Sequence, residues 1–309
     1  MSETAVRRVL LVVHVARDEA AMLAAAFAAD LRSEGLEVCV LETEDAQLRA
    51  AGLENGNTVQ AVPGAAEGCE LAVVFGGDGT ILRAAEMCRG TTTPVLGVNL
   101  GHVGFLAEAD AEDIHDVVRG VVDRTYTVEE RLTVDVSVTV GGELVATNWA
   151  LNEASVEKAA RERMLELVVE IDNRPVSRWG CDGIVCATPT GSTAYNFSAG
   201  GPIVWPEVSA LLLVPISAHA LFARPLVVSP DSTLAIEVVG ERSTGVLWCD
   251  GRRAADLPLG ARVEVRRGQE PVRLARLKPA SFADRLVRKF DLPVAGWRGA
   301  AERRQLGDG

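Results

Sequence analysis

The first feature of the sequence that could do chemistry is a glycine-rich turn, Gly-Gly-Asp-Gly-Thr, at residues 76–80. Glycine adopts positive φ without strain, and it lets a ligand approach the backbone because it has no Cβ. The helical pattern that follows is expected to begin at Thr80 or Ile81. The free N–H groups and the positive dipole end of that helix would then face the turn. The pattern therefore predicts a phosphate cradle.

Asp78 is the unusual member of this turn. A carboxylate beside a phosphate is repulsive unless it holds a metal or accepts a proton, so Asp78 indicates phosphoryl transfer and not binding alone. The turn is not a Walker A loop, because no Lys-Ser/Thr follows, and it lacks the G-x-G-x-x-G spacing of a Rossmann turn. Taken by itself, the motif leaves a second interpretation open, a tight turn with a capping aspartate.

Two shorter segments carry candidate groups near predicted strand ends. Residues 99–106, Asn-Leu-Gly-His-Val-Gly-Phe-Leu, follow a predicted strand directly, where ligands of open parallel sheets bind. Asn152 and Glu153 could hold ribose hydroxyls and a metal-linked phosphate near the end of a later strand. Each has a structural alternative: a loop shaped by glycines with Phe105 in the core, and a solvated strand end.

The segment 183–206 contains no charged residue, yet it is rich in hydroxyls and glycines. A loop normally carries charge for solvation, so this composition predicts a lined pocket for a polar ligand. Tyr195 can stack on a base. Four residues can donate and accept hydrogen bonds, namely Thr190, Ser192, Thr193 and Ser198. A buried serine-rich corner is the alternative.

The composition excludes several classes of function. The chain has 31 Lys and Arg against 43 Asp and Glu, which gives a net charge of −12. Such a surface argues against bulk nucleic-acid binding and against docking on anionic lipid, so the expected partners are small molecules, with no nucleic acid and no membrane. The six cysteines form no C-x-x-C pair, and no metal site made of protein ligands is predicted. Scattered cysteines without a signal peptide predict a cytoplasmic protein.

The elements that must position these groups follow two patterns, which predict an α/β + all-β protein. Up to residue 98, apolar runs (9–15, 37–41, 71–75, 94–98) alternate with helical patterns (19–33, 81–89), as in a parallel, doubly wound-like sheet. From about residue 125, many short strands, the last at 272–277, predict an antiparallel sandwich. An amphipathic helix opening with Ser281 is expected to return to the first domain. The predicted domains are 1–124, 125–277 and a C-terminal helix and tail at 278–309.

Together, these motifs resemble those of the NAD kinases, which phosphorylate NAD to NADP. The resemblance covers roughly residues 9–278 and includes the turn at 76–80, the segment 99–106, the Asn-Glu pair, the run 188–202 and Cys249-Asp250-Gly251. Lipid kinases of the diacylglycerol and sphingosine type share Gly-Gly-Asp-Gly-Thr, whereas Thr-Pro-Thr-Gly-Ser-Thr-Ala-Tyr is far more specific. The resemblance implies an α/β domain joined to an all-β domain, with the site between them.

The resemblance also implies a role for each matching position. Asp78 would accept the proton of the 2′-hydroxyl on the adenosine ribose of NAD. The NAD-binding residues would be Asp78, Gly79, Phe105, Asn152, Glu153, Arg163, Asp182, Thr193, Ala194, Tyr195 and Ser198. The ATP phosphates would lie against Gly76, Gly77, Gly79, Thr80, Arg83 and Arg252.

ATP is the co-substrate that the resemblance implies, bound as the complex of a divalent metal ion, Mg²⁺. It further implies a homo-oligomer, a dimer or a tetramer. Whether polyphosphate replaces ATP, and whether NADH is accepted, stays open. A lipid kinase is one alternative, but it would need an amphipathic or basic surface for reaching a membrane. A non-catalytic dinucleotide-binding protein is another, and Asp78 argues against it.

Overall fold

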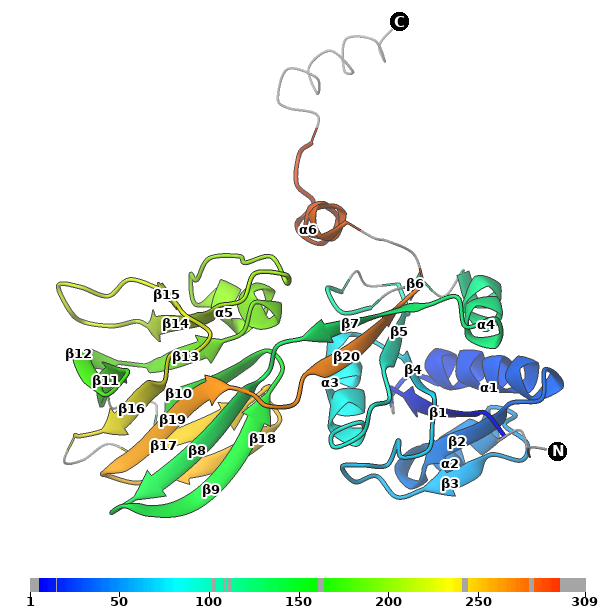
Figure 1. Cartoon of the computed structure of the whole chain (residues 1–309), viewed down its shortest axis with the longest axis horizontal. Helices are drawn as coiled ribbons and strands as arrows, with labels where there is room; N and C mark the ends of the chain where they lie inside the picture. The colour runs from blue at the N-terminus through cyan, green and yellow to red at the C-terminus, as the bar shows by residue number, and fades with distance from the viewer. Residues whose placement is uncertain are drawn as a thin grey trace, which may run out of the picture. The chain divides into compact units, whose positions relative to one another are not determined.

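The structure of the protein is a computed structural model that describes residues 6–14, 16–101, 104–107, 109–110, 113–160, 164–240, 244–277 and 281–294. The chain divides into two compact units (Figure 1). One unit consists of Met1–Glu129 with Arg273–Gly309, and the other of Glu130–Val272. Among the described helices, none has the length and apolar character that crossing a membrane requires.

An eight-stranded sheet forms the centre of the first unit. Its strands are β1 (Arg8–Val13), β2 (Glu37–Leu41), β3 (Asn57–Val59), β4 (Leu71–Phe75), β5 (Val95–Asn99), β6 (Ala109–Asp110), β7 (Thr127–Arg131) and β20 (Val272–Arg276). The order is β3-β2-β1-β4-β5-β20-β7, and β6 pairs with β5. Neighbours from β3 to β5 are parallel, which confirms the predicted parallel sheet. Because the chain runs outward from β1 to β3 and then continues on the other side with β4, the switch point lies between β1 and β4, where open sheets bind ligands.

Helices cover this sheet, which is why β4 and β5 are buried along their whole length. The helices of the unit are α1 (Asp18–Ser33), α2 (Glu42–Ala50), α3 (Asp78–Met87), α4 (Ile114–Val122) and α6 (Phe282–Phe290). On one face, the alanines and Phe27 of α1 pack against alternate residues of β1 and β4. On the other, α3 lies so close to β5 that a Cβ on Gly97 would come within 2.5 Å of Ile81 Cδ1.

Two six-stranded antiparallel sheets make up the second unit and confirm the predicted sandwich. One sheet has the order β15-β14-β13-β10-β17-β18, and the other has the order β12-β11-β16-β19-β8-β9. The strands are β8 (Val134–Val140), β9 (Glu143–Ala150), β10 (Glu153–Lys158), β11 (Leu165–Ile171), β12 (Arg174–Cys181), β13 (Gly183–Ala187), β14 (Leu211–Ile216), β15 (Leu226–Val228), β16 (Leu234–Val238), β17 (Gly245–Cys249), β18 (Arg253–Leu257) and β19 (Ala261–Arg267). Alternate residues, among them Val136, Leu167 and Leu213, form the shared core.

A short helical segment covers the outer face of β13 and β14. It consists of a 3₁₀ turn, η2 (Thr190–Thr193), and the helix α5 (Tyr195–Ser198). Val185 and Leu212 lie beneath it, with Tyr195 packed against the same cluster. These strands are therefore buried on both faces.

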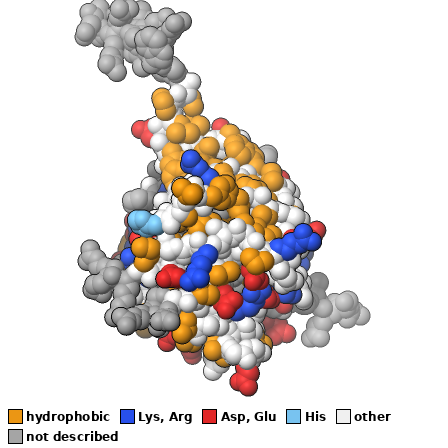
Figure 2. Space-filling model, turned by 90° about the vertical axis from the view of Figure 1, so that its left-hand side faces the viewer, with side chains coloured by type: hydrophobic (Ala, Val, Ile, Leu, Met, Phe, Trp, Pro, Cys, Tyr) orange, Lys and Arg blue, Asp and Glu red, His pale blue; other side chains and the backbone are white. Residues whose placement is uncertain are grey.

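The second unit also exposes large apolar side chains between residues 197 and 227, namely Phe197, Trp205, Val208, Leu221, Phe222 and Val227. Figure 2 shows the face of the molecule on the left-hand side of Figure 1, where hydrophobic side chains gather. We call these six residues the apolar patch.

The assignment of residues 272–277 to the antiparallel sandwich was wrong. This segment forms β20, which lies in the first sheet and pairs in parallel with β5 through Leu274 and Val95. A short alternating strand does not encode which sheet it joins, because both sheets accept the same pattern. The chain thus leaves the first unit within β7 and returns within β20.

The C-terminal helix α6 packs on the first unit, as expected. The hydroxyl of Ser281 caps it by accepting the N–H of Ala283 at 3.2 Å. The rings of Phe282 and Phe290 lie 5.8 and 5.9 Å from the ring of Phe105. Arg285 also donates to the carbonyl oxygen of Phe105 at 2.9 Å. The helix therefore fixes the segment that follows β5.

Candidate functional site

The glycine turn follows β4, at the carboxyl end of the sheet. Helix α3 begins at Asp78 and not at Thr80 or Ile81, so the aspartate lies in its first turn. The expectation of positive φ was also wrong, because none of the three glycines of the turn adopts it. A Cβ on Gly76 would come within 2.4 Å of Thr80 Oγ1, whereas Cβ atoms on Gly77 and Gly79 would meet nothing within 4 Å. Close packing therefore explains Gly76, and the open side of the turn is formed by Gly77 and Gly79.

The carboxylate of Asp78 joins two motifs that the sequence presents separately. Its Oδ2 accepts the N–H of Phe105 and its Oδ1 accepts the N–H of Leu106, each at 3.1 Å. A Cβ on Gly104 would come within 2.3 Å of Oδ1, so this close approach requires glycine. Since a carboxylate has about four lone-pair sites, about two stay available to a ligand.

Phe105 itself is 9% exposed, and its ring packs against α6. Most of the Phe105 side chain is therefore in a core position, as the structural alternative predicts. Its role in the adenosine pocket stays a prediction.

Arg83, on the same helix as Asp78, has partners within the protein. Its Nη2 donates to the carboxylate of Glu44 and, at 2.6 Å, to the carbonyl oxygen of Val13. Burial raises the pKa of Glu44 to about 7, although the Arg83 guanidinium opposes the rise. Arg252 is exposed in the turn after β17. That these two arginines contact ATP phosphates stays a prediction.

In the second unit, Glu153 begins β10 and Asn152 directly precedes it; the two residues are 7% and 8% exposed. The alternative of a solvated strand end is therefore wrong. The buried carboxylate of Asp250 accepts the N–H of Asn152 at 2.7 Å and the N–H of Leu151 at 3.0 Å. Arg253 pairs with the same carboxylate at 2.9 Å. Asp250 therefore holds the backbone of the site residues in place. Its Cys-Asp-Gly motif was recognised in the sequence, but this role was not predicted.

The environment of Glu153 favours a neutral carboxyl group. Burial, reinforced by the nearby Asp250 carboxylate, raises the pKa of Glu153 to about 8. The N–H of Tyr195 donates to its Oε2 at 3.3 Å and offsets part of this effect. At neutral pH, Glu153 therefore mostly holds its proton and can donate a hydrogen bond to a hydroxyl. This favours the ribose-hydroxyl role over the metal-linked one.

The uncharged segment after β13 has features of both predicted alternatives, a buried serine-rich corner and a lined pocket for a polar ligand. Gly191 lies against β10 so closely that a Cβ would come within 2.0 Å of the Asn152 carbonyl oxygen. The wholly buried hydroxyls of Thr188 and Ser192 donate to the carbonyl oxygens of Leu151 and Val204, at 2.6 and 3.0 Å. These hydroxyls hold the segment in place. Exposed or partly exposed positions remain for a ligand, namely Thr193, Ala194, Tyr195 and Ser198.

The remaining predicted residues of this unit include Tyr195, the first residue of α5, and Asp182, which directly precedes β13. Burial and the neighbouring Glu157 carboxylate raise the pKa of Tyr195. The ammonium of Lys158 pairs with Asp182 and lowers the pKa of that carboxyl. Because β13 pairs with β10 from Ala187 to Gly183, with Ala187 opposite Glu153, Asp182 lies roughly 17 Å along the strands from Glu153. Arg163 lies outside the described residues.

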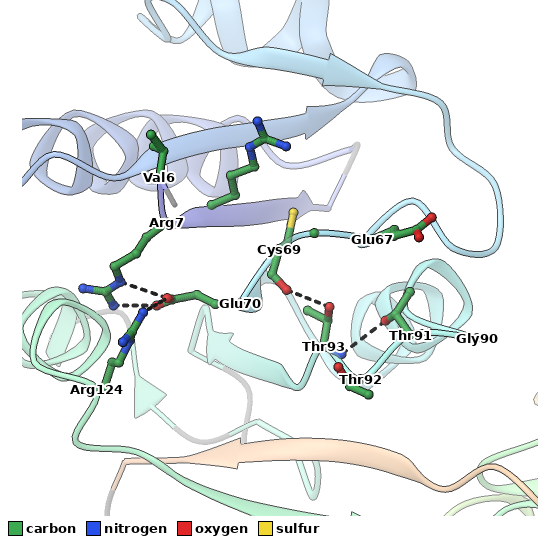
Figure 3. A pocket seen from close by; sticks show the side chains of 12 residues that line it. Val6, Arg7, Glu67, Cys69, Glu70, Gly90, Thr91, Thr92, Thr93 and Arg124 are labelled. Carbon is green, nitrogen blue, oxygen red and sulfur yellow. Dashed lines mark hydrogen bonds and ion pairs between the residues drawn. The ribbon is translucent and has the colours of Figure 1, made fainter. Parts of the chain in front are cut away.

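A cavity of about 490 Å³ lies at the opposite, amino edge of the first sheet (Figure 3). Arg7 and Arg124 both bind the Glu70 carboxylate in its wall. None of the predicted site residues lines it. The candidate site is therefore at the carboxyl edge. Among the described residues, no group of three or more His, Cys, Asp or Glu side chains is placed to hold a metal ion.

Comparison with known proteins covers most of the chain. Residues 9–126 match the family model of the ATP-NAD kinase N-terminal domain, and residues 151–277 match that of the C-terminal domain. The chain is 61% identical over 300 residues to NAD kinase 2 of Streptomyces avermitilis, covering 97% of this chain and 99% of that protein. It is 58% identical over 311 residues to the NAD kinase of Thermobifida fusca, covering 99% of this chain and 95% of that one.

Two solved structures share the fold. The NAD kinase from Archaeoglobus fulgidus in complex with ATP matches with a TM-score of 0.71 and 25% identity, covering 93% of this chain and 100% of that one. Yeast NADH kinase complexed with NADH matches with a TM-score of 0.82 and 24% identity, covering 96% of this chain and 89% of that one.

Proposed function

The chain belongs to the ATP-NAD kinase family, and we propose that Asp78 is the residue on which its reaction depends. The protein is an NAD kinase, a phosphotransferase. It transfers the terminal phosphate of ATP to the 2′-hydroxyl of the adenosine ribose of NAD, which yields NADP and ADP.

Asp78 is proposed as the acceptor of the hydroxyl proton. The observation that supports this is the position of its carboxylate, in the first turn of α3 at the switch point of the sheet, held by two N–H groups. In a loose phosphoryl-transfer transition state, little charge builds on the attacking oxygen, so a weak base suffices if it is well oriented. The two hydrogen bonds supply that orientation.

The ATP phosphates are proposed to lie at the N-terminus of α3, on the turn formed by Gly76, Gly77, Gly79 and Thr80. The open Cβ positions at Gly77 and Gly79 let an anion approach the backbone, and the helix dipole favours negative charge there. Of the two predicted arginines, Arg252 remains a candidate for a phosphate contact, since the Nη2 of Arg83 donates to Glu44 and to the carbonyl oxygen of Val13. When bound with ATP, Mg²⁺ would supply positive charge that neutralises the phosphates. The donor set fits an ion held chiefly by phosphates and waters, since Asp78 is the carboxylate of the turn.

NAD is proposed to bind along the outer face of β10 and its covering segment. The protonated Glu153 would donate to a ribose hydroxyl, beside the amide of Asn152. Tyr195, partly exposed and packed on an apolar cluster, would stack on the adenine. Phe105, Arg163, Asp182, Thr193, Ala194 and Ser198 complete the proposed set.

A homo-oligomer in the cytoplasm is the proposed state of the protein. The apolar patch supports assembly, since its six large apolar side chains are exposed and a second copy would remove them from water. A second copy would cover it.

A coupled assay that follows NADP formation from NAD, ATP and Mg²⁺ tests the proposal, with the parent compared with Asp78→Asn. Turnover in the parent and its loss in the variant support the role of Asp78. Binding of NAD without turnover in the parent would instead indicate a dinucleotide-binding protein. Replacing ATP with polyphosphate, and NAD with NADH, defines the donor and the acceptor.

A further inference from the structure

A buried ion pair lies at the end of β1, one strand away from the glycine turn. Glu44 comes from α2 and is wholly buried, whereas the side chain of Arg83, from α3, is 19% exposed. The sequence gives no sign of this burial, because Glu44 lies in an acidic run, Glu-Thr-Glu-Asp, that is typical of a solvated helix start.

Both side chains bind the same backbone residue. Glu44 Oε2 accepts the N–H of Val13 at 2.7 Å, and Arg83 Nη2 donates to the carbonyl oxygen of Val13 at 2.6 Å. The register of β1 with β2 ends at the pair Leu11 and Val40. Val13 therefore lies beyond the paired part of β2, and the two side chains satisfy the backbone groups that a strand would otherwise satisfy.

This arrangement connects α2, β1 and α3 at the switch point of the sheet. On its other side, β1 pairs with β4 up to Val13 and Phe75, and the N–H of His14 donates to the carbonyl oxygen of Phe75 at 3.0 Å. Phe75 directly precedes the glycine turn. Arg83 lies five residues after Asp78 on the same helix, so a shift of the pair shifts the helix that carries the carboxylate.

We propose that Glu44 and Arg83 are positioning residues for the phosphoryl transfer, which hold the first turn of α3, and with it Asp78, against the end of β1. The inference rests on the proposed role of Asp78. A buried ion pair is weak evidence for a stabilising role, because the cost of desolvating two charges offsets much of their attraction. What the pair supplies beyond apolar packing is direction, since each charge has fixed hydrogen-bond partners on β1.

Steady-state kinetics of four variants in the full-length enzyme test the proposal: Glu44→Gln, Arg83→Gln, the double variant, and Arg83→Lys. A displacement of about 1 Å at a reacting group can cost about a hundredfold in rate. We expect each Gln variant to lower kcat by about tenfold to a hundredfold. The KM values for ATP and NAD should stay within about threefold of those of the parent, because neither residue is proposed to contact substrate.

The double variant should be no slower than the slower single variant, because both changes break one connection. Arg83→Lys keeps the charge but not the planar fork, and it should recover part of the lost kcat. Asp45→Asn is the matched control, since it breaks an ion pair of 2.7 Å to Arg49 on the same helix, where the Arg49 side chain is 48% exposed. We expect the control to match the parent.

Two kinetic outcomes would overturn the proposal. If Arg83→Gln raises the KM for ATP tenfold or more while Glu44→Gln changes nothing, Arg83 binds phosphate directly. If both variants keep the parental kcat and only melt at a lower temperature, the pair is structural.

Hydrogen exchange at residues 76–82 gives a readout that does not depend on turnover. Exchange there should be faster in the Arg83 variants than in the parent, with α1 unchanged, and equal rates refute the positioning role. An inactive parent would refute the proposed function instead.

Discussion

Replacing Asp78 with asparagine tests the proposed chemistry, and the structure shows what the substitution changes. The carboxylate accepts one N–H at each oxygen, from Phe105 and from Leu106. Asparagine keeps one acceptor and turns an amide NH₂ group toward the other N–H. The variant therefore loses the negative charge, the proton acceptor and one hydrogen bond of the loop.

The magnitudes of these losses differ enough to be separated. A hydrogen bond to a charged group contributes about 1.5–3 kcal/mol, so the free energy of unfolding should fall by about 2 kcal/mol. General-base catalysis contributes about 10²–10⁴-fold. We expect kcat to fall by about two to four decades, while NAD affinity measured by calorimetry stays within a few-fold. The kinetic effect, about 3–5 kcal/mol in the transition state, exceeds the structural one.

Gly104→Ala is the matched control. Its new Cβ would come within 2.3 Å of Asp78 Oδ1, so it displaces the same contact but keeps the carboxylate group and its charge. The kcat of Asp78→Asn should be at least about tenfold below that of Gly104→Ala. Near-normal turnover of Asp78→Asn would make Asp78 a turn residue. Loss of NAD or ATP binding together with turnover would make it a metal ligand, and either result would refute the reasoning.

Four further predictions concern the second unit. The pKa of Glu153 is raised from 4.5 to about 8, so the folded protein retains a proton that the unfolded chain has lost, and stability should fall as pH rises between these values. Glu153→Gln removes this dependence on pH. In urea unfolding, the free energy of unfolding of the variant should therefore rise relative to that of the parent from pH 6 to pH 8.5, and parallel pH profiles would contradict the shift. Tyr195→Ala should raise the KM for NAD about ten- to a hundredfold with little change in melting temperature; an unchanged KM, or a collapse of stability, would place Tyr195 in the core. Asp250→Ala removes the carboxylate that pairs with Arg253 and accepts the N–H groups of Leu151 and Asn152, so calorimetry should show about 3–5 kcal/mol of lost stability, and an unchanged transition would exclude the organising role. Leu221→Asp, in the apolar patch, should shift the oligomer toward monomer in light scattering; an unchanged mass would move the interface elsewhere.

The predictable parts of the molecule were those that follow from local pattern. Apolar runs next to helical patterns marked the parallel sheet, and strict alternation as at Val134–Val140 marked the sandwich, because burial on one or two faces dictates these patterns. The sheet to which β20 belongs could not be predicted, since it is decided by pairing with strands far away in the sequence. Both glycine-rich motifs were recognisable, but not that Gly104 makes room for Asp78.

The parts that could not be predicted depend on burial of polar groups by distant elements. Nothing local distinguishes Glu44 from its partly exposed neighbour Asp45, because only the fold brings Arg83 to Glu44. The same holds for Asp250, whose partners at the start of β10 lie about a hundred residues earlier. A sequence shows which side chains can do chemistry, whereas the residues that hold them become visible when the elements are packed.

The return of the chain through β20 has a consequence for the order of events during synthesis. Within the first sheet, β20 lies between β5 and β7, so β7 has no strand beside it until β20 has been made. The whole of Glu130–Val272 must therefore leave the ribosome first. Until then, the edge of β5 at Val95 and the acceptors that Arg276 later meets, the Leu106 carbonyl and the Glu129 carboxylate, lack these partners. The second unit, an uninterrupted segment, can fold while the first is still open, so a nascent chain stalled just after Val272 would expose an incomplete sheet edge to pairing with other chains.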